Sequence, residues 1–212
     1  MNLRPEQLQA LDYARRYGTE ASVASIRERA AGTFRDLEAL FAAVPEELAR
    51  RRPAPGVWCL WEVADHLEVS HRGVAGDLAL LQSGTVPPGG PVPAGLLSPD
   101  PFARSWAGVT GDLAAVHREI LATLDRSADD APALVRAPVV VVVRCATPDG
   151  DSEPVEWVES FDWKAFALLV RVHTLEHLGQ ARRILDRLGR GAPETGGQEP
   201  GGGASRGTSR SP

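Results

Sequence analysis

Cysteine is scarce in this sequence, which contains only Cys59 and Cys145 among its 212 residues. Two thiols do not make a disulfide framework, so we expect a reducing compartment, the cytoplasm. Positive charge is not in excess either, because 23 Lys and Arg face 28 Asp and Glu, for a formal net charge of −5. This acidic balance disfavours nucleic acid as a partner. The longest apolar run, residues 138–143, is too short to span a membrane, and the polar N-terminus does not resemble a signal peptide.

Helical periodicity is what the sequence does contain. Apolar residues recur every three or four positions in several segments with no proline in their interiors. The predicted helices cover residues 4–17, 19–44, 58–82, 100–126 and 161–188. Before the last of them, the Val-rich run 138–143, a Pro-Asp-Gly turn and residues 154–159 predict a hairpin. We therefore predict an all-α fold: an up-and-down four-helix bundle with an extra N-terminal helix and a small β-hairpin insertion before the last helix.

Composition also suggests the limits of the domain. Residues 1–18 would form an N-terminal helical extension and residues 19–189 the helix bundle. Residues 190–212, rich in Gly, Ser and Pro, cannot bury a core and are predicted to be a disordered tail. Asp100 followed by Pro101 has the pattern of a helix start, with Asp as the N-cap.

Two histidines stand four residues apart in the last predicted helix, His173 and His177. This spacing places both imidazoles on one helix face, one turn apart, where two ring nitrogens can bind one metal ion. The alternative is a helix that simply packs two histidines against its neighbours.

His66 favours the metal interpretation, because it lies beside the apolar stripe of another predicted helix. Facing helices of a bundle can pool their ligands, and three imidazoles without a cation would need other partners. His71 lies about 140° further round the same helix, so we expect it to be solvated. His117 lies on the inner side of its helix, where we expect a packed or hydrogen-bonded ring rather than a fourth ligand.

Other polar residues have two interpretations each. Gln180 lies on the same face as His173 and either fixes a ring tautomer or is a polar residue of the bundle. Glu62, one turn before His66, is either a catalytic base or a helix cap. Cys59 begins that helix, a position that lowers the pKa of a thiol.

Two motifs resemble those of the DinB-like superfamily. WCLWEVADHL at residues 58–67 resembles W-S-x-x-E-x-x-x-H-L, and HTLEHLGQ at residues 173–180 resembles H-x-x-x-H-x-x-Q. The resemblance implies a four-helix bundle that carries a divalent metal on three histidines, here His66, His173 and His177. Cys59 replaces the usual serine, which would cap the helix better, but no ligand is lost.

The resemblance also implies a chemistry. Members of the family include metal-dependent transferases that use a small thiol such as bacillithiol or mycothiol. We therefore expect a small-molecule thiol and an electrophilic substrate as partners, and zinc as the metal, with nickel, iron or manganese as alternatives. A metal-dependent hydrolase and a non-catalytic, stress-associated metal-binding bundle are the competing functions. A homodimer through helix faces would suit the bundle.

Overall fold

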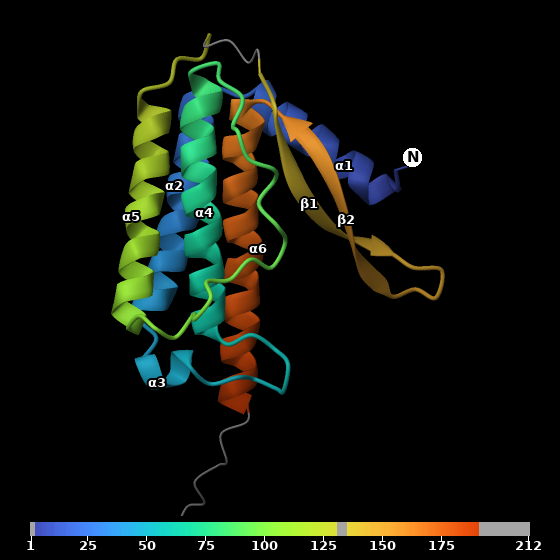
Figure 1. Cartoon of the computed structure of the whole chain (residues 1–212). Helices are drawn as coiled ribbons and strands as arrows, with labels where there is room; N and C mark the ends of the chain where they lie inside the picture. Colours follow the sequence, from blue (N-terminus) through green and yellow to red (C-terminus); the bar gives the residue numbers. More distant parts are fainter. Residues whose placement is uncertain (1–2, 131–134, 191–212) are drawn as a thin grey trace, which may run out of the picture.

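The computed structural model describes residues 3–130 and 135–190 of the chain (Figure 1). Within these ranges the chain is mostly helical and carries a small antiparallel sheet before its last helix, as predicted. The elements in chain order are α1 (Pro5–Ala14), a π-helical turn (Arg15–Thr19), α2 (Val23–Ala42), α3 (Glu46–Ala49), α4 (Leu60–Gln82), α5 (Trp106–Asp125), β1 (Ala137–Ala146), β2 (Ser152–Phe161) and α6 (Trp163–Arg190). The predicted tail lies outside the described residues beyond Arg190, and the domain limits stay predictions.

The four long helices α2, α4, α5 and α6 lie side by side (Figure 1). α2 and α4 each pack against both α5 and α6. Two apolar clusters fill the interior, and each takes buried residues from all four helices. The cluster that also includes Ala49 of α3, which we call the lower cluster, contains Leu37, Trp61, Leu113 and Leu178. The other cluster, which we call the upper cluster, contains Phe34, Leu78, Ile120 and Phe166.

The two clusters also give the direction of each long helix. The lower cluster takes the C-terminal halves of α2 and α6 but the N-terminal halves of α4 and α5. α4 and α5 are therefore parallel to each other and antiparallel to α2 and α6, so the predicted up-and-down order is wrong for α4 and α5. The connection between them, residues 83–105, runs back along the helices (green in Figure 1). Helix bundles accommodate this order through one long crossover connection.

Helix ends differ from the prediction where a competing cap exists. α5 begins at Trp106, not at Asp100, because the Ser105 hydroxyl accepts a hydrogen bond from the Gly108 N–H at 3.1 Å. α6 begins two residues later than predicted, because the Asp162 carboxylate accepts the N–H groups of Lys164 and Ala165, each at 3.0 Å. The short helix α3 lies between the predicted helices 19–44 and 58–82, where no element was predicted.

The predicted hairpin is confirmed and is longer than expected. β1 and β2 pair antiparallel over ten residues each, with Val141 opposite Trp157. Ala137 and Phe161 face each other at its base and are buried, which ties the hairpin to the start of α6. Figure 1 shows the hairpin extending away from the long helices beside α1, which contacts β1.

Gly18 fixes the contact between the N-terminal segment and α6. A Cβ atom on Gly18 would lie 2.6 Å from the Cα of Ala165, a separation that real structures do not tolerate. We expect Gly18→Ala to lower the free energy of unfolding by about 1–3 kcal/mol, the usual cost of overpacking. The measurement is urea unfolding followed by circular dichroism.

Gly76 is the matched control for this substitution, because it lies within α4 and a Cβ there would meet nothing within 4 Å. Gly76→Ala should raise the free energy of unfolding by about 0.5–1 kcal/mol through helix propensity. Shifts of the same sign in both variants would show that the contact with Ala165 does not constrain the chain.

Candidate metal centre

The five histidines of the chain occupy one level of the helix interior. His66 and His71 come from α4, His117 from α5, and His173 and His177 from α6. Along α4 and α6, His71, His173 and His177 lie between residues of the lower and the upper cluster, whereas His66 lies among lower-cluster residues and His117 among upper-cluster residues. His66, His71 and His117 are buried and His173 and His177 are half-buried, so most of the ring nitrogens need a partner within the protein.

Three of these rings converge through their Nε2 atoms. The Nε2 of His173 lies 3.0 Å from the Nε2 of His66 and 3.0 Å from that of His177. All three ligand atoms lie within 4.8 Å of one another. Two nitrogens bound to a tetrahedral zinc ion are about 3.3 Å apart, as follows from Zn–N distances of about 2.0–2.1 Å. The spacing therefore suits one shared cation.

The remaining nitrogens of two rings show which tautomer is present. The Nδ1 of His66 lies 2.7 Å from the carbonyl oxygen of Leu96, and the Nδ1 of His177 lies 2.7 Å from the amide Oε1 of Gln180. Both oxygens are acceptors, so each Nδ1 carries a proton and donates it. The Nε2 atoms of His66 and His177 therefore carry no proton, and their lone pairs are directed at His173.

A cation fits this arrangement better than hydrogen bonds do. If His173 carried a proton on Nε2, that proton could serve only one of the two lone pairs that face it. Burial lowers the pKa of His66 and His173, and it lowers the pKa of His177 to about 4, so all three rings are neutral near pH 7. Neutral imidazole is the metal-binding form.

Because these pKa values are lower in the folded chain than in the unfolded one, the metal-free protein loses stability as pH falls below about 6.5.

A family model supports the same conclusion from the sequence. The model described as the DinB superfamily matches residues 29–181, which is most of the chain and includes all three converging histidines. The chain belongs to the DinB superfamily. Members are typically metal-binding, and the His66, His173 and His177 group could hold a metal in this DinB chain as well. Comparison with curated proteins and with solved structures gives no significant match.

His71 is not solvated, so that prediction is wrong. Its side chain is 1% exposed, and its Nε2 lies 3.1 Å from the Nδ1 of His173. His71 does not join the three converging rings, because its Nε2 lies at the Nδ1 of His173, whereas His66 and His177 face the Nε2 of that ring. His117 is buried and hydrogen-bonded, as expected, and stacks on Phe34 with ring centroids 3.9 Å apart.

Glu62 acts as a helix cap in this structure. One carboxylate oxygen accepts the N–H of Cys59 at 2.9 Å, and the other pairs with Arg52 at 2.5 Å. Since both oxygens have partners at the start of α4, the geometry favours the capping interpretation over the catalytic base. Cys59 itself is fully buried, and burial raises the pKa of its thiol, which overrides the lowering that we expected from the helix N-terminus.

The crossover connection between α4 and α5 is held by hydrogen bonds beside His66. Asp65, next to His66 and fully buried, accepts hydrogen bonds from the N–H and the hydroxyl of Ser98, each at 2.8 Å. Arg104 binds Asp65 at 2.9 Å and Glu68 at 3.0 Å. These contacts position Leu96, whose carbonyl orients His66. Sequence reasoning missed this group, although the acidic residue beside His66 was a signal.

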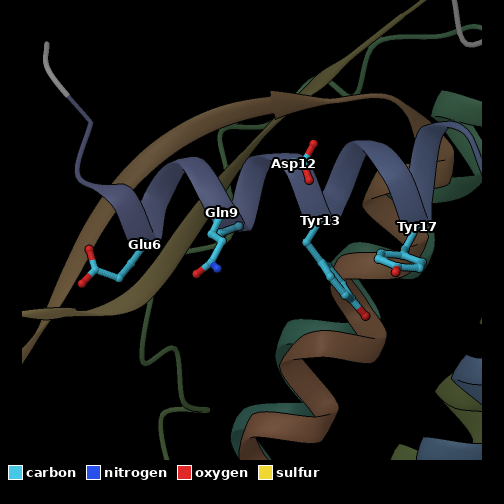
Figure 2. A pocket seen from close by; sticks show the side chains of 6 residues that line it. Glu6, Gln9, Asp12, Tyr13 and Tyr17 are labelled. Carbon is cyan, nitrogen blue, oxygen red and sulfur yellow. The ribbon is translucent and has the colours of Figure 1, made fainter.

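The aromatic residues near the site have different surroundings. Trp61 and Trp163 belong to the apolar clusters, whereas the half-buried Trp58 lies with its ring centroid 5.2 Å from that of His66. A separate hollow of about 390 Å³ lies along α1, lined by Glu6, Gln9, Ala10, Asp12, Tyr13 and Tyr17 (Figure 2). It contains none of the histidines. The Tyr13 hydroxyl points toward α6 and accepts a hydrogen bond from Arg171 at 2.8 Å.

No helix among the described residues combines the length and the apolar character needed to cross a membrane.

Proposed function

We propose that this chain is a divalent-metal-dependent enzyme that activates a small-molecule thiol for transfer to an electrophilic substrate. The observation that carries the proposal is the convergence of three Nε2 atoms from α4 and α6, two of which belong to rings whose Nδ1 faces an acceptor oxygen. His66, His173 and His177 would hold the ion. Zinc suits three imidazoles, and nickel, iron and manganese are alternatives. Membership of the DinB superfamily supports the metal.

The ligand count supports catalysis over a structural role. Structural zinc sites are closed by four protein ligands, whereas catalytic sites have three and leave a position open. A bound divalent ion lowers the pKa of a thiol or water that it holds and so supplies a nucleophile at neutral pH. In the proposed transfer, the thiol sulfur bonds to an electrophilic carbon, the leaving group departs with its electron pair, and the thiol proton passes to solvent.

The two cysteines of the chain do not compete for the role of nucleophile. Cys59 is fully buried at the start of α4, with its thiol pKa raised by burial. Cys145 is also fully buried and lies near the end of β1, in the hairpin that extends from the helices. A thiol from a small molecule therefore fits the site better than a protein thiol does.

The test is a turnover assay of the full chain loaded with zinc. A panel of small thiols is offered with electrophiles such as an alkyl halide and an epoxide, and thioether formation is followed by mass spectrometry. We expect metal-dependent thioether formation that His177→Asn lowers by at least about 100-fold, because the variant lacks a ligand. Glu28→Gln, an exposed change on α2, should leave the rate unchanged.

Two results would replace the proposal. Hydrolysis of the electrophile without thioether formation would identify a hydrolase that uses the same open position for water. Zinc binding with no turnover of any thiol or water reaction would identify a metal-binding protein without catalysis.

A further inference from the structure

We propose that a row of three residues behind the metal centre, Glu38, His117 and His71, fixes the tautomer of His173 so that its Nε2 is free for the ion. We call these three residues the histidine row. They touch neither His66 nor His177 by any hydrogen bond among the described residues. The inference rests on the metal of the proposed function and adds positioning residues to that site.

The histidine row is continuous from the edge of α2 to the metal centre. The carboxylate Oε1 of Glu38 lies 2.7 Å from the Nδ1 of His117. The Nε2 of His117 lies 3.3 Å from the Nδ1 of His71. The Nε2 of His71 lies 3.1 Å from the Nδ1 of His173. Each ring thus uses both of its nitrogens, one toward the carboxylate and one toward the metal centre.

Glu38 determines which nitrogen of each ring in this row carries the proton. A carboxylate oxygen without a proton only accepts hydrogen bonds, so a neutral His117 donates to it from Nδ1 and keeps its Nε2 as an acceptor. His71 must then donate from Nδ1, which leaves its own Nε2 as an acceptor. His173 therefore donates from Nδ1 to His71, and its Nε2 is a lone pair facing those of His66 and His177.

Burial makes this order of protons strict. His71 and His117 are each 1% exposed, so water cannot replace a missing partner. A neutral imidazole has one donor and one acceptor nitrogen, so each buried ring passes only one order of protons to the next. Glu38 is the accessible end, with its side chain 36% exposed. A metal ligand whose second nitrogen is held by a fixed partner binds its ion more tightly.

A purely structural role for the row makes a different prediction. If these residues only filled space, a change at Glu38 would not reach His173, which it does not touch. If the row determines which nitrogen of each ring carries the proton, Glu38→Gln will change the tautomer of His173, because an amide can also donate a hydrogen bond. A donating amide reverses His117, then His71, and places the proton of His173 on the Nε2 that should bind the ion.

The first experiment reads the tautomer in the metal-free full chain. Imidazole ¹⁵N–¹H correlation spectra of wild type, with His173 assigned by comparison with His173→Asn, should show the proton on Nδ1. Glu38→Gln should shift part of the His173 population to the Nε2–H form, and Glu28→Gln, an exposed carboxylate on the same helix, should not. An Nε2–H form in wild type, or an unchanged His173 in Glu38→Gln, would overturn the inference.

The second experiment measures zinc affinity by competition with a chelator. We expect His71→Phe, which preserves a buried ring, to weaken zinc binding by about 10–100-fold, and Glu38→Gln by about tenfold. Equal affinity in wild type and Glu38→Gln would contradict the row even where His71→Phe fails to fold. A wild-type chain that binds no zinc would refute the proposed function instead, while the metal-free spectra would still decide the role of the row.

Discussion

Zinc will stabilise the wild-type chain and will not stabilise a His66→Ala, His177→Ala double variant. At a free zinc concentration 1,000 times the dissociation constant, binding to the folded state alone adds about 4 kcal/mol to the free energy of unfolding. The double variant retains one of the three converging imidazoles, so we expect its affinity to fall by more than about 1,000-fold. The measurement is thermal unfolding with and without zinc, together with metal content after dialysis.

The metal-free proteins sharpen this prediction, because wild type and double variant should differ much less in stability without zinc than with it. In wild type without metal, the lone pairs of His66 and His177 face His173 at 3.0 Å, with too few protons to satisfy them. Removing two of these rings relieves that conflict, although it also leaves a cavity. We therefore expect the double variant to lose much less stability without metal than with it. An equal loss in both conditions would show that the histidines serve packing alone.

The grouping of the three histidines was predictable because its signal is local. His173 and His177 share one helix face by their spacing, and the WCLWEVADHL motif places His66 on a second helix. The partners of these rings depend on the tertiary arrangement. The acceptor for His66 is the main-chain carbonyl of Leu96, in a connection without periodicity. The environment of His71 depends on how α6 packs against α4, which helical rotation alone does not give.

The directions of the helices were missed for a related reason. Amphipathic patterns show that a helix is buried on one side, but they do not show which way it runs. Short connections make neighbouring helices antiparallel, and the connection after α4 is long enough to return along the whole helix. The length of the Pro- and Gly-rich segment 83–100 was therefore the sequence feature that indicated parallel helices. This crossover is the segment that supplies Leu96 and Ser98 to the surroundings of His66.

Arg104→Ala will be among the most destabilising substitutions of a charged residue and will lower the free energy of unfolding by about 3 kcal/mol. The guanidinium joins Asp65, which is fully buried, to Glu68, whose side chain is 4% exposed. Removing it leaves two buried carboxylates with fewer partners, and breaking a buried ion pair typically costs about 3–5 kcal/mol. Ser98 still binds Asp65 and Arg72 still binds Glu68, so the lower end applies. Urea unfolding measures the cost.

Arg27→Ala is the matched control, because Arg27 pairs with Asp125 where both side chains are about half exposed. An exposed ion pair contributes below about 1 kcal/mol, so the two arginine variants should differ by about 2 kcal/mol or more. Arg104→Ala should also speed amide hydrogen exchange near Ser98, since the crossover loses an anchor, and weaken zinc binding through the Leu96 carbonyl. Equal costs for the two variants, with unchanged exchange at Ser98, would show that Arg104 does not hold the crossover against the metal centre.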